Sequence, residues 1–360
     1  MNPSESTSEA TKARSAERIR WGPVVGLFLL APLVSEYLLG VMSIRLLPLL
    51  LVLGPIYGGG ALLIRETVRR RQLGWSNLIV LALAFGIIEE GLVLQTLFRP
   101  DFMGLHLIAY GYIPVLGMGA WWTLYVLGIH TIWSIAVPIV LVESLVPRAR
   151  ALPWLRPRWL PVIAVLFVLG SAANFLLTRQ PGSTASLVQL VVGGCVVVVL
   201  IAVAVLVKPQ RQADLANATA APGLLPVGTV AFVLGSAFMA LLLAGVLLGG
   251  AIPGLSVSGG IRSDLPAPVV VAGQIATIAG GIALLRKVSG RAGWNASHQL
   301  AVATGLLLTY AWYGLVQVML SDDSDAVAVV GQCLFVLGAA AMLVLAWKVR
   351  KKHASTLVAG

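Results

Sequence analysis

Residues 76–98, SNLIVLALAFGIIEEGLVLQTLF, form an apolar run long enough to cross a bilayer, with two adjacent acids inside it. These acids are Glu89 and Glu90. A carboxylate inside a bilayer costs on the order of 3 kcal/mol unless it is protonated, paired or in contact with water. We therefore expect a membrane-spanning fold, and we expect the acid pair to be its functional centre.

The rest of the chain has the composition of a multi-pass membrane protein. Of its 360 residues, 58% are hydrophobic and 11% are charged, and the mean hydropathy is +0.93. Soluble domains carry about 25% charged residues, so this balance excludes a soluble globular protein. Arginine outnumbers lysine, and Ala, Val, Leu and Gly dominate, which is typical of a high-GC bacterial genome. We expect the plasma membrane of a bacterium.

A search for apolar runs of about 20 residues predicts an all-α bundle of ten transmembrane helices. The expected spans are 22–41, 43–64, 76–98, 119–146, 159–178, 185–207, 225–248, 268–286, 299–320 and 325–348. These spans divide into a four-helix module and a six-helix module. The expected segments are a disordered cytoplasmic tail (1–21), the four-helix module (22–146), a cytoplasmic linker (147–158), the six-helix module (159–348) and a basic cytoplasmic tail (349–360).

Positive charge sets the expected orientation of the helices, because cytoplasmic loops carry an excess of Lys and Arg. With the N-terminus in the cytoplasm, all but four of the 25 basic residues fall on the inside. The exceptions are Arg45, Arg99, Arg179 and Arg262. Both termini are therefore expected to be cytoplasmic. The basic residues flank helix ends, where they meet the lipid bilayer, so we expect no nucleic-acid partner.

The embedded polar residues concentrate in the first four expected spans. At a rise of 1.5 Å per residue, Glu89 and Glu90 lie ~4 Å to the outer side of mid-membrane, His130 lies at the same level, and Glu36 lies ~7 Å out. We predict that Glu89, Glu90 and His130 form one site. The residues expected to support it are Glu36, Gln95 and Ser134, the last of which shares a helix face with His130.

A second polar group is expected near the inner boundary. Glu143 lies about 220° around its helix from His130, at the level of Arg65 and Glu66. An ion pair is the simplest way to accommodate these charges, so we interpret Arg65, Glu66 and Glu143 as structural.

The acid pair, followed forty residues later by His130-Thr131-Ile132-Trp133-Ser134, resembles the CPBP (CAAX protease and bacteriocin-processing) family of intramembrane metalloproteases. That family carries a Glu-Glu-x-x-x-Arg motif and a His-x-x-x-Asn-like pattern. Here Leu94 and Ser134 stand at the arginine and asparagine positions, and no second intramembrane histidine is present. The resemblance implies that Glu89, Glu90 and His130 bind one divalent metal ion such as zinc, and that a glutamate activates water.

Several functions remain open at this stage. The chain is either a divergent metal-dependent hydrolase acting on a membrane-embedded substrate or a relative that has lost catalysis. Alternatively, it is a proton- or cation-coupled transporter whose embedded acids bind the ion. A third alternative is a scaffold or partner subunit, in which the acids are protonated or hydrogen-bonded to a neighbouring helix and have no substrate.

Overall fold

The computed structural model describes residues 20–180, 182–207, 219–247, 265–321 and 324–358. Nearly all of the tail expected over residues 1–21 lies outside these ranges. Ten helical spans in the described residues are long and apolar enough to cross a membrane, as predicted. The first four are Trp21–Leu38, Ile44–Arg70, Trp75–Val93 and Ala120–Leu145, and the other six are Pro157–Thr178, Leu187–Leu206, Leu224–Val246, Ala267–Ser289, Ala296–Leu320 and Ala326–Thr356.

Each of the first four spans is built from several helical pieces. The first two spans contain α2 (Trp21–Pro32), η1 (Leu33–Leu38), η2 (Ile44–Leu49), α3 (Leu50–Leu53), η3 (Gly54–Gly58) and α4 (Gly59–Arg70). The next two contain α5 (Trp75–Ile87), η4 (Ile88–Val93), α6 (Ala120–Ile129), η5 (His130–Ala136) and α7 (Val137–Leu145). The segments η1, η3, η4 and η5 are π-helical, whereas η2 is a 3-10 helix.

The remaining spans are more regular. They contain η6 (Pro157–Trp159), α8 (Leu160–Thr178), α9 (Leu187–Leu206), α10 (Leu224–Leu247), α11 (Ala267–Ser289), α12 (Ala296–Leu320) and α13 (Ala326–Val358). The segment expected as a basic tail at 349–360 is helical as far as Val358, and its assignment as a cytoplasmic tail stays a prediction. Residues 349–358 contain no Gly or Pro, and Lys, Arg and Ala all favour helix, so α13 continues past the apolar part of its span.

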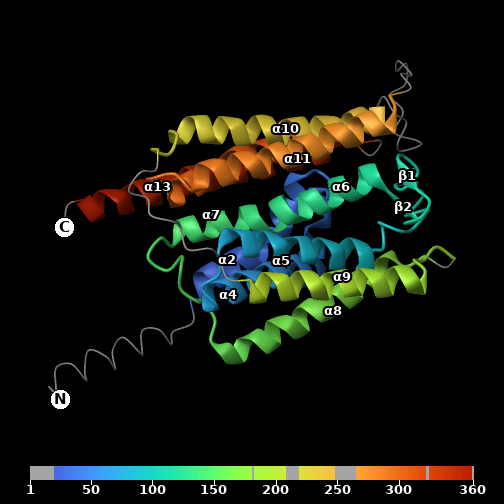
Figure 1. Ribbon diagram of the computed structural model, residues 1–360, viewed down its shortest axis with the longest axis horizontal. Helices are drawn as coiled ribbons and strands as arrows, with labels where there is room; N and C mark the ends of the chain where they lie inside the picture. Colours follow the sequence, from blue (N-terminus) through green and yellow to red (C-terminus); the bar gives the residue numbers. More distant parts are fainter. Residues whose placement is uncertain (1–19, 181, 208–218, 248–264, 322–323, 359–360) are drawn as a thin grey trace.

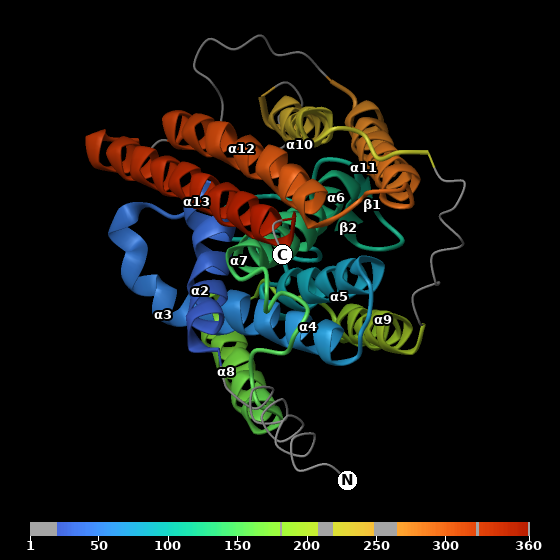
Figure 2. The ribbon, with the colours of Figure 1, turned by 90° about the vertical axis from the view of Figure 1, so that its left-hand side faces the viewer.

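The helices run side by side along the long axis of the molecule (Figure 1). Viewed from the end, α6 and α7 lie between two groups, with α10–α13 on one side and α2, α4, α5, α8 and α9 on the other (Figure 2). The central α6–α7 span is accordingly 78% buried. The structure groups α8 and α9 with the first four spans, since α8 packs on η3 and α9 packs on α5. The predicted division into modules at 147–158 stays a prediction.

The outer helices present apolar faces that no described residue covers. Only 11% of the α11 span is buried, and the long side chains of Val165, Leu176 and Leu187 are exposed on α8 and α9. Cys195 and Cys333, which lie in apolar runs and would be expected to be buried, are exposed on these outer surfaces. A bundle with apolar outer faces fits a lipid surrounding, because lipid tails solvate such faces.

The segment between the third and fourth spans folds as a compact cap and contains the two short strands of the described chain. Strands β1 (Tyr112–Ile113) and β2 (Met118–Gly119) pair antiparallel, with Tyr112 opposite Gly119. The cap is tied to other spans, since Tyr110 Oη donates to the Leu265 carbonyl (2.7 Å) and Gln180 Oε1 accepts from Arg99 (2.9 Å). It therefore covers one end of the bundle (Figure 1).

Candidate functional site

The four π-helical segments found among the described residues all contribute to one buried cluster. Glu36 lies in η1, Tyr57 in η3, Glu89 and Glu90 in η4, and His130 in η5. Their wider turns are seen in i to i+5 backbone bonds, such as that from Leu94 N to the Glu89 carbonyl. A π turn interrupts the α-helical ladder and is frequent at functional sites. Four such turns at one place give independent structural support to the site.

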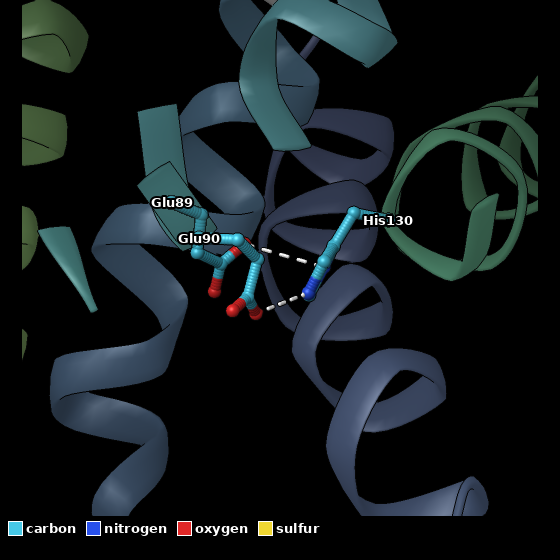
Figure 3. A group of neighbouring side chains, drawn as sticks. All are labelled: Glu89, Glu90 and His130. Carbon is cyan, nitrogen blue, oxygen red and sulfur yellow. Dashed lines mark hydrogen bonds and ion pairs between the residues drawn. The ribbon is translucent and has the colours of Figure 1, made fainter. Parts of the chain in front are cut away.

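His130 faces both acids from the opposite side of the site, as Figure 3 shows. Its Nε2 lies 2.8 Å from Oε1 of Glu90, and its Nδ1 lies 3.3 Å from Oε2 of Glu89. The exposed fractions of the three residues are 3%, 4% and 0% in the order His130, Glu90 and Glu89. One imidazole thus contacts both members of the adjacent acid pair, away from solvent.

The site presents the donor set of a metal site. One ligand atom from each of Glu89, Glu90 and His130 lies within 4.8 Å of the others. No hydrogen bond of good geometry reaches either carboxylate oxygen of Glu89 within the described residues, and its nearby polar partners are His130, whose Nδ1 lies 3.3 Å from Oε2, and Tyr57. A buried carboxylate that is so weakly hydrogen-bonded is suited to hold a cation or a proton. Two carboxylates and an imidazole are ligands that Zn²⁺ and similar divalent ions accept, so the residues fit a metal.

Glu90 is held by a second donor from its own chain segment. Thr96 Oγ1 donates to Oε2 of Glu90 in a short hydrogen bond, and Trp122 Nε1 in turn donates to Thr96 Oγ1 (3.1 Å). Glu90 therefore has a hydrogen-bond partner on each carboxylate oxygen, whereas Glu89 has the longer contact of Oε2 with His130 and no hydrogen bond of good geometry from the described residues. The two adjacent acids are chemically distinct: Glu90 is oriented, and Glu89 can accept a cation or a proton.

The imidazole of His130 is oriented from three directions. Ser134 Oγ lies 3.0 Å from Nδ1, which is the interaction expected from the spacing of these two residues. The ring of Tyr57 stacks on the imidazole with centroids 5.9 Å apart, and Phe85 meets it edge-on at 6.3 Å. Tyr57 Oη also donates to Glu36. Glu36 thus joins the cluster through Tyr57.

A glycine allows the third and fourth spans to approach at this level. A Cβ placed on Gly86 would lie 3.3 Å from Cβ of His130, so a larger residue would push the helix of His130 away from the acids. Small residues are what lets neighbouring membrane helices approach closely. The three atoms nearest to a Cβ placed on Gly91, on the other side of the pair, belong to Ile87, Leu97 and Phe98 of its own segment.

Two further residues considered from the sequence lie elsewhere. Gln95 Oε1 accepts a hydrogen bond from Ala185 N (2.9 Å), so this buried side chain ties the end of the third span to the loop before α9. His106 Nδ1 lies 3.3 Å from the Pro100 carbonyl oxygen in the cap. Neither of them belongs to the group of metal-ligand type formed by the described residues.

Comparison with known proteins places the chain in a family. A family model described as "Uncharacterized membrane protein family" matches residues 26–357. The chain belongs to this family. No curated protein and no solved structure matches it. The match runs from the first span to the last, so the Glu/His cluster lies within the part of the chain that defines this membrane protein family.

A second group of buried charges predicted from the sequence lies where α4 meets α7. Arg65 contacts Glu66 (2.6 Å) and Glu143 (3.1 Å), and Arg69 binds both carboxylate oxygens of Glu143 at 2.7 Å. Arg65 is fully buried and lies 3.5 Å above the ring of Trp154. The structure thus brings the three predicted ion-pair residues together. Arg69 and Trp154 also belong to this group. We interpret the group as structural, because its charges are paired with one another.

The same network holds the loop after the fourth span. Glu66 accepts hydrogen bonds from the backbone N–H groups of Trp154 and Leu155 at 2.8 and 3.2 Å. Arg65 donates to the carbonyl of Arg150 (2.8 Å). Because these polar backbone groups are buried, they need such partners. The segment expected as a linker is therefore fixed against α4.

Sequence reasoning misses Tyr57 and Thr96 in the site. Tyr57 lies in the run Gly54–Gly60, where glycines indicate helix contact, and a lone tyrosine there gives no indication of its partner. Thr96 follows Glu90 by six residues, a spacing that matches neither the α-helical face nor a known motif. Only the π turn and the end of the span bring its hydroxyl back to Glu90.

Proposed function

We propose that Glu89, Glu90 and His130 bind a divalent metal ion within the membrane, and that the chain is a divergent metal-dependent hydrolase of CPBP type. The observation that carries the proposal is the fully buried, weakly hydrogen-bonded carboxylate of Glu89 beside the two other ligand groups, with ligand atoms within 4.8 Å of one another. The matched family has no assigned activity, so the proposal rests on this geometry.

The residues of the chain have separate roles in this proposal. A divalent ion in such a site supplies Lewis-acid activation of water. Glu90, fixed by Thr96, and His130, fixed by Ser134, act as oriented ligands, in the way that outer hydrogen bonds orient metal ligands in known sites. Glu89 can ligate or accept a proton, because its carboxylate is buried and only weakly hydrogen-bonded by the described residues.

The metal content of the purified protein tests the proposal. We expect about one divalent ion per chain by elemental analysis after exposure to zinc and removal of free metal. Glu90→Gln and His130→Gln should lose the ion, whereas Asp325→Asn, which removes an exposed acid elsewhere, should retain it. A wild-type protein that binds no zinc, manganese or cobalt would contradict the proposal.

A second candidate is a proton- or cation-coupled transporter. One observation favours it: Glu36, Tyr57, His130 and the acid pair form a contiguous buried chain of titratable groups. Such chains serve as proton relays in membrane transporters. A proteoliposome assay with a pH-sensitive dye distinguishes the two candidates. Proton movement that disappears in Glu89→Gln, without bound metal in the wild type, would favour the transporter.

The proposed setting is the plasma membrane of a bacterium with both termini in the cytoplasm. The distribution of Lys and Arg supports this orientation. The start of α2 and the end of α13 lie at the same end of the bundle, in keeping with an even number of spans. Protease or cysteine-labelling access to the C-terminal end of α13 in inverted vesicles tests it.

A further inference from the structure

A cavity of about 420 Å³ lies at one end of the bundle, where α2 begins and where α7 and α13 end. Four of its lining residues carry basic side chains, namely Arg20, Arg148, Lys352 and His353. None of the described residues that line it is acidic. Small-molecule sites have volumes of about 300–1,000 Å³, so the cavity is large enough for a polar head group.

The basic groups of the cavity differ from the arginines of the buried ion network at this end of the bundle. Arg65, Arg69 and Arg70 are all ion-paired. In contrast, no hydrogen bond or ion pair links the side chains of Arg20 and Arg148 to any residue in the described ranges. Three elements distant in sequence therefore direct unpaired positive charge at one hollow, which favours an anion.

The position of the cavity indicates the kind of anion. It lies at the ends of three membrane spans, Trp21–Leu38, Ala120–Leu145 and Ala326–Thr356, hence at the level of the lipid head groups. Its walls also include the apolar side chains of Pro23, Leu145 and Val349. Apolar walls cannot bind a free phosphate, which has no apolar surface. They can pack against the glycerol and the upper acyl carbons of a lipid. Basic pockets between helices at the cytoplasmic side are known to bind anionic lipid head groups.

We propose that this cavity, formed by Arg20, Arg148, Lys352 and His353, is a binding site for the phosphate head group of an anionic phospholipid. The site is separate from the Glu/His cluster, which lies in the π-helical middle of the first four spans. Its ligand bridges the start of α2, the loop after α7 and the end of α13. Binding therefore stabilises the packing of α13 against the first four spans.

The test uses the purified full-length chain in a neutral detergent. Dioctanoyl phosphatidylglycerol, dioctanoyl phosphatidylcholine and inorganic phosphate are titrated separately, with binding followed by calorimetry. The pocket variant combines Arg148→Gln and Lys352→Gln, and both side chains are exposed, so the fold should persist. The control combines Arg286→Gln and Lys287→Gln, exposed residues in the last turn of α11 that remove the same charge outside the cavity.

We expect phosphatidylglycerol to bind the wild type and the control with equal affinity, and the pocket variant at least about tenfold more weakly, because two charge-assisted contacts are lost. Phosphatidylcholine should not bind. Equal affinity of the pocket variant and the wild type would overturn the proposal, and so would an equal loss in the control. Inorganic phosphate binding as tightly as phosphatidylglycerol would show a free-phosphate site and overturn the assignment to lipid.

Discussion

Nε2 of His130 lies 2.8 Å from Oε1 of Glu90, although the two residues are 40 positions apart in the chain. This contact joins the third span to the central fourth span inside the bundle. Replacing His130 with Gln removes the buried imidazole that contacts both Glu89 and Glu90. Removal of one member of a buried pair costs about 3–5 kcal/mol, so we expect a clearly lower unfolding midpoint in detergent.

The matched control for this variant is His106→Gln. His106 is exposed in the cap, and its ring has one hydrogen-bond partner among the described residues, the Pro100 carbonyl, so the unfolding midpoint should change little. Equal midpoints for His130→Gln and His106→Gln would mean that the Glu/His cluster contributes nothing to folding.

Thr96→Val tests the hydroxyl that orients Glu90. The valine removes the donor to Glu90 and the acceptor for Trp122, which leaves two buried polar groups without a partner. We expect a loss of about 1–3 kcal/mol and weaker metal binding. In Thr131→Val the lost bond goes to the Leu127 carbonyl one turn back in the same span, so stability should be unchanged or slightly higher. A larger loss of stability in Thr131→Val than in Thr96→Val would contradict the inference that Thr96 orients Glu90.

The ten spans can be predicted from the sequence because length and hydropathy alone decide which segments can enter a bilayer. The common level of Glu89, Glu90 and His130 is predictable for a similar reason, since the rise per residue of a helix is fixed. The contacts of Glu143 with Arg65 follow the same depth argument. The depth of a residue along its membrane span can therefore be predicted from a single sequence.

What lies around each helix axis is harder to predict. The π turns at Glu36, Tyr57, Glu90 and His130 rotate later side chains away from their α-helical positions, and no composition marks them. Tertiary packing has to select these turns. The packing of α8 on η3 and of α9 on α5 also cannot be predicted from the sequence, because α8 and α9 are apolar on all sides.

Arg65→Met tests the buried ion network between α4 and α7. The substitution leaves Glu66 and Glu143 in contact with fewer cations and removes the donor to the Arg150 carbonyl. We expect a loss of about 3–5 kcal/mol. Arg45→Met is the matched control, because Arg45 forms an exposed pair with Asp325 (2.6 Å), and exposed pairs contribute little. If Arg65→Met and Arg45→Met lowered the unfolding midpoint by similar amounts, the burial of Arg65 would not add to the stability that its ion pairs provide.

The exposed pair gives a prediction about pH. Hydrogen bonds from Arg45 hold the pKa of the Asp325 carboxyl below its ordinary value. Because the folded pKa is the lower one, the pair stabilises the fold above the ordinary carboxyl pKa and stops doing so as the pH falls through the lowered value. The difference in unfolding midpoint between wild type and Asp325→Asn should be small at pH 7 and vanish in acid. A difference that grows in acid would contradict this sign.

Gly58→Ala probes the close contact that sets Tyr57. A Cβ at Gly58 would lie 2.6 Å from Cα of Phe28, a backbone atom that cannot move without shifting α2. Such overpacking costs about 1–3 kcal/mol. The shift also moves Tyr57 relative to Glu36 and His130, so metal binding should weaken along with stability. In Gly194→Ala, where no atom lies within 4 Å, helix propensity should raise stability by roughly 0.5–1 kcal/mol and leave metal content unchanged. If the Gly58→Ala protein were destabilised but kept its full metal content, Tyr57 would not contribute to metal binding.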